Sequence, residues 1–363
     1  MKINTSESPT YLHFFIYCIL FTTSSRGFST FNAINMRVNK LHFSGLMMFF
    51  LLFLSSYQLK AQQDPLYTNF MFNKLVYNPA FAGTNPEFIC ATFLLHNQWS
   101  GFGSDADEYV GAAPTTNTFS LHAPIPNSNT FGGVGMYVLN DVEGYNLTTT
   151  ANIAFSLKRY FSFGAVYLGI NAGIIQKGIN NTFWRAPDPN DPTIPSGQQS
   201  AIRPDLGAGL YVFSQNKFFA GISSQHLIPG TFNWGGPQYE IVRQSYLTAG
   251  YSFVLPSNPF IEFQPSVLYK IDKARKQFDI NMNVMYKDRF WGGLQYRQGD
   301  AVSALLGLKL TSNLKFGYAY DLTVTELNKY SQGTHEVLIS YCFKIVIKPR
   351  VIIPNIIWTP RYL

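Results

Sequence analysis

Four histidines and one acidic run are the residues beyond position 61 whose types suggest metal chemistry. The histidines, His96, His122, His226 and His335, stand apart from one another, with no HxH or HExxH spacing and no acidic cluster beside them. Because a zinc site needs several ligands at close spacing, we predict no metal site. The run SDADE at 104–108 lacks the ordered spacing of an EF-hand, so we interpret it as a solvated loop tip.

Nucleophilic chemistry is equally poorly supported. The chain has no GxSxG motif, and its scattered Ser, His, Asn and Asp residues suggest no particular catalytic pairing. The glycine-rich stretch GGVG at 132–135 lies within an expected strand, where glycine more often marks close packing or curvature than a phosphate cradle. We therefore expect a protein that is not an enzyme and that has no cofactor.

The composition favours a protein whose strands are apolar on one face only. Of 363 residues, 46% are hydrophobic and 16% aromatic, but only 13% are charged, about half the usual fraction for a soluble domain. The mean hydropathy is close to zero. These features fit an outer-membrane β-barrel. A large soluble β-sandwich or propeller is the alternative that composition leaves open.

The N-terminal region predicts export. From Met36 the chain has a basic start with Arg37 and Lys40, an apolar stretch at 46–54 and a cleavage site after Ala61. We interpret 1–35 as a mis-annotated extension and 36–61 as a Sec signal peptide; a long leader with a second membrane segment is the alternative. Removing 1–61 takes away five basic residues and one acidic residue, which lowers the net charge from +7 to +3. Nucleic acid is therefore not an expected partner.

Apolar and polar residues alternate along much of the remaining chain with the period of two that is typical of strands. In 277–287, every second residue from Phe278 to Tyr286 is apolar, and the alternate positions include Asp279 and Asn281. In 335–343 the apolar parity ends in Tyr341 and Phe343, which we expect to face lipid. About fourteen strands are predicted, at 87–96, 115–124, 129–140, 145–159, 163–177, 202–213, 217–226, 244–255, 259–270, 276–287, 290–298, 301–310, 313–320 and 335–345.

The connections between these strands predict the topology. Four are long, at 97–114, 178–201, 227–243 and 321–334, and all four are odd-numbered, whereas every even-numbered connection is short. Barrels of bacterial outer membranes have short periplasmic turns and longer extracellular loops. We therefore predict an all-β transmembrane antiparallel barrel at 87–345 with both termini periplasmic. A periplasmic lead-in at 62–86 precedes it, and a basic, proline-containing periplasmic tail at 346–363 follows it.

Candidate contact residues lie in the loops and in the tail. Trp99, Trp184 and Trp234 fall in long connections, where exposed aromatic side chains bind partners; packing within a loop cap is the alternative. Arg350 and Arg361 make the tail basic, and we hypothesise that the tail is a second partner-binding site. Two cysteines remain after the signal peptide, Cys90 and Cys342. Closure of the barrel makes their strands neighbours and parity turns both inward, so a disulfide between them is an open prediction.

Three stretches of the mature chain resemble one protein family. After the signal peptide comes QQDPLYTNFMFNKLVYNPAFAGTNPE (62–87), and late in the chain come GGLQYRQGDAVSALLGLKLTSNLKFGYAYDLT and YSQGTHEVLISYCF. These resemble the PorP/SprF family of Bacteroidota outer-membrane proteins. The positions that match its opening motif are Gln62, Gln63, Pro65, Phe70, Met71, Asn73, Asn78, Pro79, Ala80, Phe81, Ala82 and Gly83.

The resemblance implies an outer-membrane component of the type IX secretion system. It implies a barrel that binds the C-terminal domain of a secreted surface protein or adhesin, including gliding adhesins, and supports its secretion and retention at the cell surface. Other type IX secretion components and outer-membrane lipid are further expected partners. Among the motif residues, Asn78, Pro79 and Gly83 are candidates for partner contact, with a purely structural role as the alternative. The competing function is a passive porin or a transporter of hydrophobic solutes.

Overall fold

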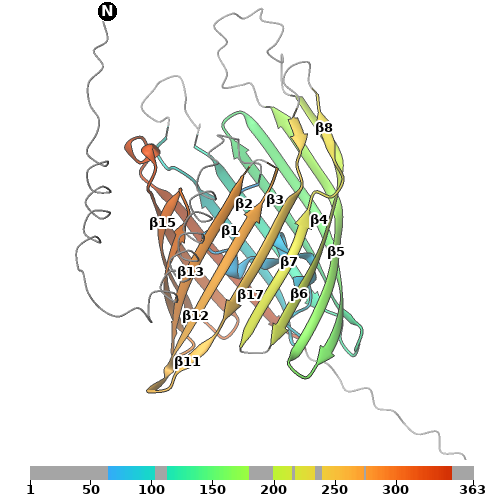
Figure 1. The fold of residues 1–363 in the computed structure, drawn as a ribbon, viewed down its shortest axis with the longest axis vertical. Coiled ribbons are helices and arrows are strands. Elements are labelled where there is room, and N and C mark those ends of the chain that lie inside the picture. Colours follow the sequence, from blue (N-terminus) through green and yellow to red (C-terminus); the bar gives the residue numbers. More distant parts are fainter. Residues whose placement is uncertain are drawn as a thin grey trace, which may run out of the picture. The chain divides into compact units, whose positions relative to one another are not determined.

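The computed structural model describes residues 64–102, 113–179, 199–214, 217–233, 239–273 and 275–345, which form a closed sheet and one short separate hairpin (Figure 1). The strands of the sheet are β1 (Phe88–Asn97), β2 (Thr115–Pro124), β3 (Phe131–Glu143), β4 (Asn146–Phe161), β5 (Gly164–Ile179), β6 (Gln199–Ser214), β7 (Phe218–Gln225), β10 (Gln244–Tyr251), β11 (Phe253–Leu255), β12 (Asn258–Ile271), β13 (Lys276–Tyr286), β14 (Phe290–Arg297), β15 (Ala301–Lys309), β16 (Leu314–Thr323) and β17 (Thr334–Lys344). Because β10 and β11 are two parts of one strand, the barrel has 14 strands, as the alternation predicts.

The barrel closes between its first and last strands. β1 pairs with β2 on one side and with β17 on the other, where Cys90 lies opposite Cys342 and His96 lies opposite Glu336. The ladder continues through consecutive antiparallel neighbours on both sides until β10 meets β12. Closure leaves the sheet without a free edge, which is the condition for placing strands in lipid.

The outer face carries the apolar side chains that the sequence assigns to lipid. On β17, Ile339, Tyr341 and Phe343 are 42%, 39% and 53% exposed, whereas Glu336, Leu338 and Ser340 on the opposite parity are buried. A surface covered with exposed Leu, Ile, Phe and Tyr side chains is stable in hydrocarbon and not in water. The arrangement confirms the prediction of an outer-membrane barrel with its apolar parity outward.

The two mouths of the barrel differ. We call the end at which β1 ends and β2 begins the long-loop mouth, and the end at which β2 ends and β3 begins the short-turn mouth. The long-loop mouth also carries two features that alternation did not predict: a hairpin of β8 (Gly230–Phe232) and β9 (Tyr239–Ile241), and the 3-10 helix η4 (Glu326–Lys329). Each is too short to leave a periodic signal in the sequence.

The segment before β1 lies inside the barrel. It contains the 3-10 helix η1 (Phe70–Phe72), the helical turn α3 (Lys74–Tyr77) and the 3-10 helix η2 (Pro79–Phe81), drawn in blue in Figure 1. We call residues 64–84 the plug, because most of them are buried against the inner faces of the strands. None of the described helices is long and apolar enough to cross a membrane. The sequence predicts only a periplasmic lead-in at 62–86, and the structure places 64–84 of it inside the barrel.

Candidate functional site

The first plug residue, Asp64, is held by side chains from several strands. Its carboxylate lies 3.2 Å from His226 Nε2 and accepts a hydrogen bond from Tyr246 Oη at 2.8 Å. Lys270 Nζ donates to the Asp64 carbonyl oxygen at 2.7 Å. On its other side, His226 Nδ1 lies 2.9 Å from Asp205 on β6. The inner faces of β6, β10 and β12, together with the residue after β7, therefore converge on one plug residue.

The protonation states of this group follow from its geometry. Burial alone would raise the pKa of Asp64, but His226, together with Lys270 and Tyr246, holds the pKa well below its usual value of 3.8. Burial alone would lower the pKa of His226, but Asp64 and Asp205 raise it to about 10. At neutral pH the contact between plug and wall is therefore an ion pair.

A second attachment follows at Thr68 and Asn69. The carboxylate of Glu336 on β17 accepts hydrogen bonds from the backbone N–H of Thr68 at 2.9 Å and of Asn69 at 2.6 Å. It also accepts a bond from the Asn69 side-chain amide at 2.8 Å and lies 2.8 Å from His96 Nδ1 on β1. One fully buried carboxylate thus satisfies two plug N–H groups that would otherwise be buried without partners.

Arg297 extends this network across the neighbouring strands. Its guanidinium is 2% exposed and donates to Asp279 at 3.1 Å, to Asp321 at 3.2 Å and to Asp300 at 3.3 Å. It also reaches the Thr68 hydroxyl at 3.4 Å, and that hydroxyl donates to Asp321 at 2.7 Å. A buried guanidinium is stable only when its charge and its N–H groups are matched, and here strand carboxylates match them.

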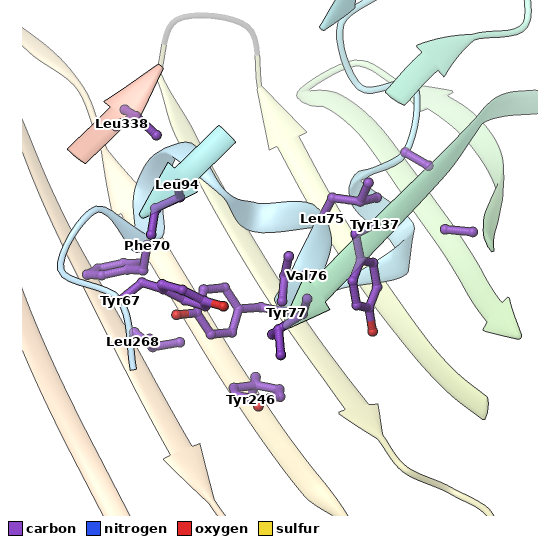
Figure 2. Packing of buried hydrophobic residues seen from close by; sticks show 13 residues of the cluster. Tyr67, Phe70, Leu75, Val76, Tyr77, Leu94, Tyr137, Tyr246, Leu268 and Leu338 are labelled. Carbon is purple, nitrogen blue, oxygen red and sulfur yellow. The ribbon is translucent and has the colours of Figure 1, made fainter. Parts of the chain in front are cut away.

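The centre of the plug is an apolar cluster (Figure 2). Tyr67, Phe70 and Leu75 are each 1% exposed and pack against inward-facing wall residues such as Leu338 and Leu268. The Tyr67 hydroxyl forms a 2.5 Å hydrogen bond with the hydroxyl of Thr118 on β2. The interior of the barrel therefore has a packed core of its own, made from the plug and the wall together.

The second half of the plug binds β6 and β7 through backbone groups. The Asn78 side chain donates to the carbonyl of Leu210 at 3.0 Å and accepts a bond from the N–H of Ala80, which caps η2. The carbonyl of Tyr77 accepts a bond from Ser223 Oγ at 2.7 Å. The motif Asn-Pro-Ala thus fixes a tight turn against the wall.

Glycines let the plug approach the strands closely. A Cβ on Gly169 of β5 would lie 2.3 Å from the backbone nitrogen of Ala80. Gly83, with φ of +72°, packs against Gly132 and Gly133, and a Cβ there would lie 2.4 Å from the Gly132 carbonyl oxygen. The GGVG stretch is therefore a close-packing site, as the sequence suggests.

These contacts also give the plug a direction. Asp64 touches His226 and Tyr246, which lie near the long-loop ends of β7 and β10. Gly83 touches Gly132 and Gly133 at the short-turn end of β3. The plug therefore runs through the barrel from the long-loop mouth to the short-turn mouth.

A pocket remains between the first plug residues and the wall. Its free space, about 30 Å³, has room for about two water molecules. Its lining is polar and aromatic and consists of Asp64, Pro65, Tyr67, Val76, Tyr77, Tyr137, Leu139, Asp141, Thr148, Thr150, Gln225, His226 and Tyr246. Several of these residues lie toward the long-loop ends of their strands, so the pocket belongs to that half of the barrel.

The residues that the sequence suggests as partner contacts lie in different parts of the structure. Asn78 and Pro79 are buried, and with Gly83 they hold the plug to the wall. Trp99 lies in the connection after β1, where its ring packs edge-on to Phe102 with centroids 6.3 Å apart. The remaining candidates, Trp184, Trp234, Arg350 and Arg361, lie outside the described residues.

The cysteines and histidines form contacts within the barrel and its plug. Cys90 and Cys342 are joined by a disulfide across the β1–β17 pair. His96 and His226 bind carboxylates, whereas His122 packs on Phe81 with ring centroids 5.0 Å apart. Among the residues that the structure describes, no group of three or more His, Cys, Asp or Glu side chains is arranged to hold a metal ion.

Sequence reasoning missed the residues that bind the plug. Glu336, Arg297 and Asp321 sit on the parity that faces inward, and each is at most 2% exposed. A charged residue on an inward face needs a partner when the interior is packed. That signal is present in the sequence, but it does not identify the segment that supplies the partner.

Comparison with known proteins shows the family. None of the curated protein sequences matches the chain. Among solved structures, the chain is similar to the CymD monoaromatic hydrocarbon channel (TM-score 0.47, 11% identity, 76% of this chain and 93% of that chain covered). It is also similar to the toluene transporter TbuX of Ralstonia pickettii (0.46, 11%, 75% and 93%) and to Omp33 of Acinetobacter baumannii (0.40, 7%, 71% and 99%).

The sequence match to a family is more extensive. Residues 59–341 match the family described as type IX secretion system membrane protein PorP/SprF. The matched range includes the whole plug and every strand of the barrel except the last residues of β17. The chain is therefore a member of the PorP/SprF family, an outer-membrane β-barrel of the type IX secretion system.

Proposed function

We propose that this barrel binds the C-terminal domain of a secreted surface protein or adhesin and supports its secretion and its retention at the cell surface. The observation that carries the proposal is the family match over 59–341, which includes both plug and barrel. Other components of the secretion system are further proposed partners. The proposal makes the protein a receptor and anchor, with no catalytic step.

The geometry supports a receptor with its binding surface at the long-loop mouth. The long connections, the β8–β9 hairpin and the polar pocket all lie at this end. Trp99 is positioned there, and so is Tyr330, which is 69% exposed beside η4. Exposed aromatic side chains are frequent anchors of protein interfaces. We propose that these loops make the first contact with the partner, and that the basic tail with Arg350 and Arg361 serves a partner on the periplasmic side.

The alternative of a passive porin gains no support from the interior. Asp279, Asn281 and Asn283, which would line a wet lumen, are at most 2% exposed. The plug fills the centre of the barrel with buried aromatic and aliphatic side chains, including Tyr67 and Phe70. A packed plug suits an anchor, which needs a rigid wall and no permanent pore.

Deletion of the gene tests the proposal. We expect one particular surface protein to be lost from the cell surface, either because it is released into the medium or because its export stops. Proteomics of the surface, the medium and the cell interior would identify it, and complementation with the wild-type gene should restore it. Unchanged surface display of every type IX substrate would refute the proposal.

Point variants then locate the contact. Trp99→Ala and Tyr330→Ala should reduce surface retention while the barrel still folds, as judged by heat-modifiable gel mobility. Phe260→Ala is a matched control, because Phe260 is also an exposed aromatic (57%, against 69% for Tyr330) but lies at the opposite mouth, in β12. Equal loss of retention in the control would place the contact elsewhere.

A further inference from the structure

The geometry points to a carboxylate-binding site inside the barrel, formed by His226, Tyr246 and Lys270. We propose that Asp64 fills this site in the resting barrel, and that a carboxylate of a partner polypeptide entering by the long-loop mouth takes its place. We call these three side chains the carboxylate cradle. The part of the proposal that concerns the partner rests on the proposed function above; the cradle itself does not.

The cradle is built to hold a carboxylate. His226 Nε2 and Tyr246 Oη reach the two Asp64 carboxylate oxygens at 3.2 and 2.8 Å. Lys270 Nζ is bound beside them to the backbone carbonyl of the same residue. The three side chains are 7%, 5% and 3% exposed, so each is fixed by its surroundings and little ordering is needed to bind a ligand.

The charge of the cradle requires an anion. His226 and Lys270 contribute two positive charges, and Asp205 behind His226 compensates only one of them. Loss of Asp64 would leave His226 and Lys270 with one fewer compensating carboxylate while nearly buried, which is costly. Exchange of one carboxylate for another preserves both the charge and the hydrogen bonds of the cradle.

The carboxylate position can be reached from solvent. The Asp64 side chain is 22% exposed, although its partner His226 is nearly buried. Asp64, His226 and Tyr246 all line the small pocket described above. A carboxylate that takes the place of the Asp64 segment beside this pocket would therefore meet the cradle directly.

The two halves of the plug are attached differently, which permits local exchange. The first residue is held by an ion pair and hydrogen bonds at the edge of a pocket. The last residues interlock with strand glycines at backbone contact distance, as Ala80 does with Gly169 and Gly83 with Gly133. The Asp64 end can therefore leave its site while the Gly83 end stays in place.

The test of the cradle uses sodium formate and the purified full-length barrel. Leu66→Cys provides a reporter, because Leu66 is 5% exposed and the other cysteines of the described chain, Cys90 and Cys342, are bonded to each other. In this background, Asp64→Ala should increase the rate of thiol labelling at position 66 at least about tenfold. Formate should reverse the increase, because it replaces the missing carboxylate, and sodium chloride at equal ionic strength should not.

A second variant keeps this test falsifiable. Adding His226→Gln to Asp64→Ala removes one of the two cationic side chains of the cradle and the ion-pair partner of Asp205, so the effect of formate on labelling should be largely lost. If formate leaves Asp64→Ala unchanged, or protects both variants equally, the carboxylate cradle is refuted. Heat-modifiable mobility checks that each variant is folded. This outcome is independent of any partner and therefore of the proposed function.

The source of the partner carboxylate is tested with the surface protein identified by gene deletion. Its C-terminus is extended by a short Gly-Ser segment in one variant, which displaces the terminal carboxylate, and its acidic side chains are changed to amides in another. Loss of co-purification with the first identifies the terminal carboxylate, and loss with the second identifies a side chain. Undiminished co-purification of both refutes binding of the partner at the cradle while leaving the proposed function intact.

Discussion

The attachment of the plug at Glu336 allows a quantitative test. Glu336→Gln keeps the shape of the side chain but replaces one acceptor oxygen by an NH₂ group and removes the charge. Its carboxylate accepts three hydrogen bonds from Thr68 and Asn69 and pairs with His96. A hydrogen bond to a charged group contributes about 1.5–3 kcal/mol. We expect a loss at the upper value, about 3 kcal/mol, because several hydrogen bonds share this carboxylate and the amide retains only one acceptor.

That loss should appear as faster local opening of the plug. A change of about 3 kcal/mol corresponds to roughly 100-fold faster hydrogen exchange of the amides of Thr68 and Asn69. Exchange measured by mass spectrometry on a peptide covering 64–73 reports this directly, with strand peptides as an internal reference. Glu326→Gln is the matched control, because Glu326 is 93% exposed and pairs only at the surface with Lys329. If Glu336→Gln and wild type exchange equally in the plug, Glu336 does not hold it.

The remaining predictions concern packing, pH and conduction. Gly169→Ala should destabilise the plug by about 1–3 kcal/mol in thermal unfolding, whereas Gly292→Ala, whose Cβ would meet its nearest atom at 3.5 Å, should be nearly neutral. The contribution of His226 to stability should be complete below pH 6.5 and be lost as the pH rises through about 10, since its pKa is raised. That of Asp64, whose pKa is lowered, is present above pH 3.8 and lost in acid. Protection in 64–66, taken as the exchange rate relative to the intrinsic rate at the same pH, should therefore be greatest between about pH 4 and 6.5 and lose this dependence in Asp64→Asn. In planar bilayers the wild-type barrel should not conduct, and a steady pore conductance would contradict the plug.

The strands could be predicted because their signal is local. Lipid on one side and a packed interior on the other force alternate side chains to differ, and ten or so residues suffice to show it. β17 is the clearest example, since Ile339, Tyr341 and Phe343 face outward as their parity predicts. Closure between β1 and β17 follows from an even strand count.

The plug could not be predicted in the same way, because its stability comes from distant residues. Thr68 and Asn69 bind Glu336, more than 260 positions further along the chain. No local pattern in 64–84 distinguishes such a segment from a solvated lead-in, since its helical turns are only three or four residues long. The usable signal lay on the strands instead, in inward glycines such as Gly169 and inward charges such as Arg297, which require a close and polar partner.

The plug and the closing seam of the barrel depend on each other. Glu336 and His96 face each other in the β1–β17 register, so the pair that binds Thr68 and Asn69 is complete only after the first and last strands have met. Cys90 and Cys342 lie in the same ladder, six residues away along β1, and hold that pairing covalently. The plug therefore clamps the seam from inside while the disulfide closes it within the wall. A partner that displaced the whole plug would have to weaken this seam, whereas exchange at Asp64 alone leaves it closed.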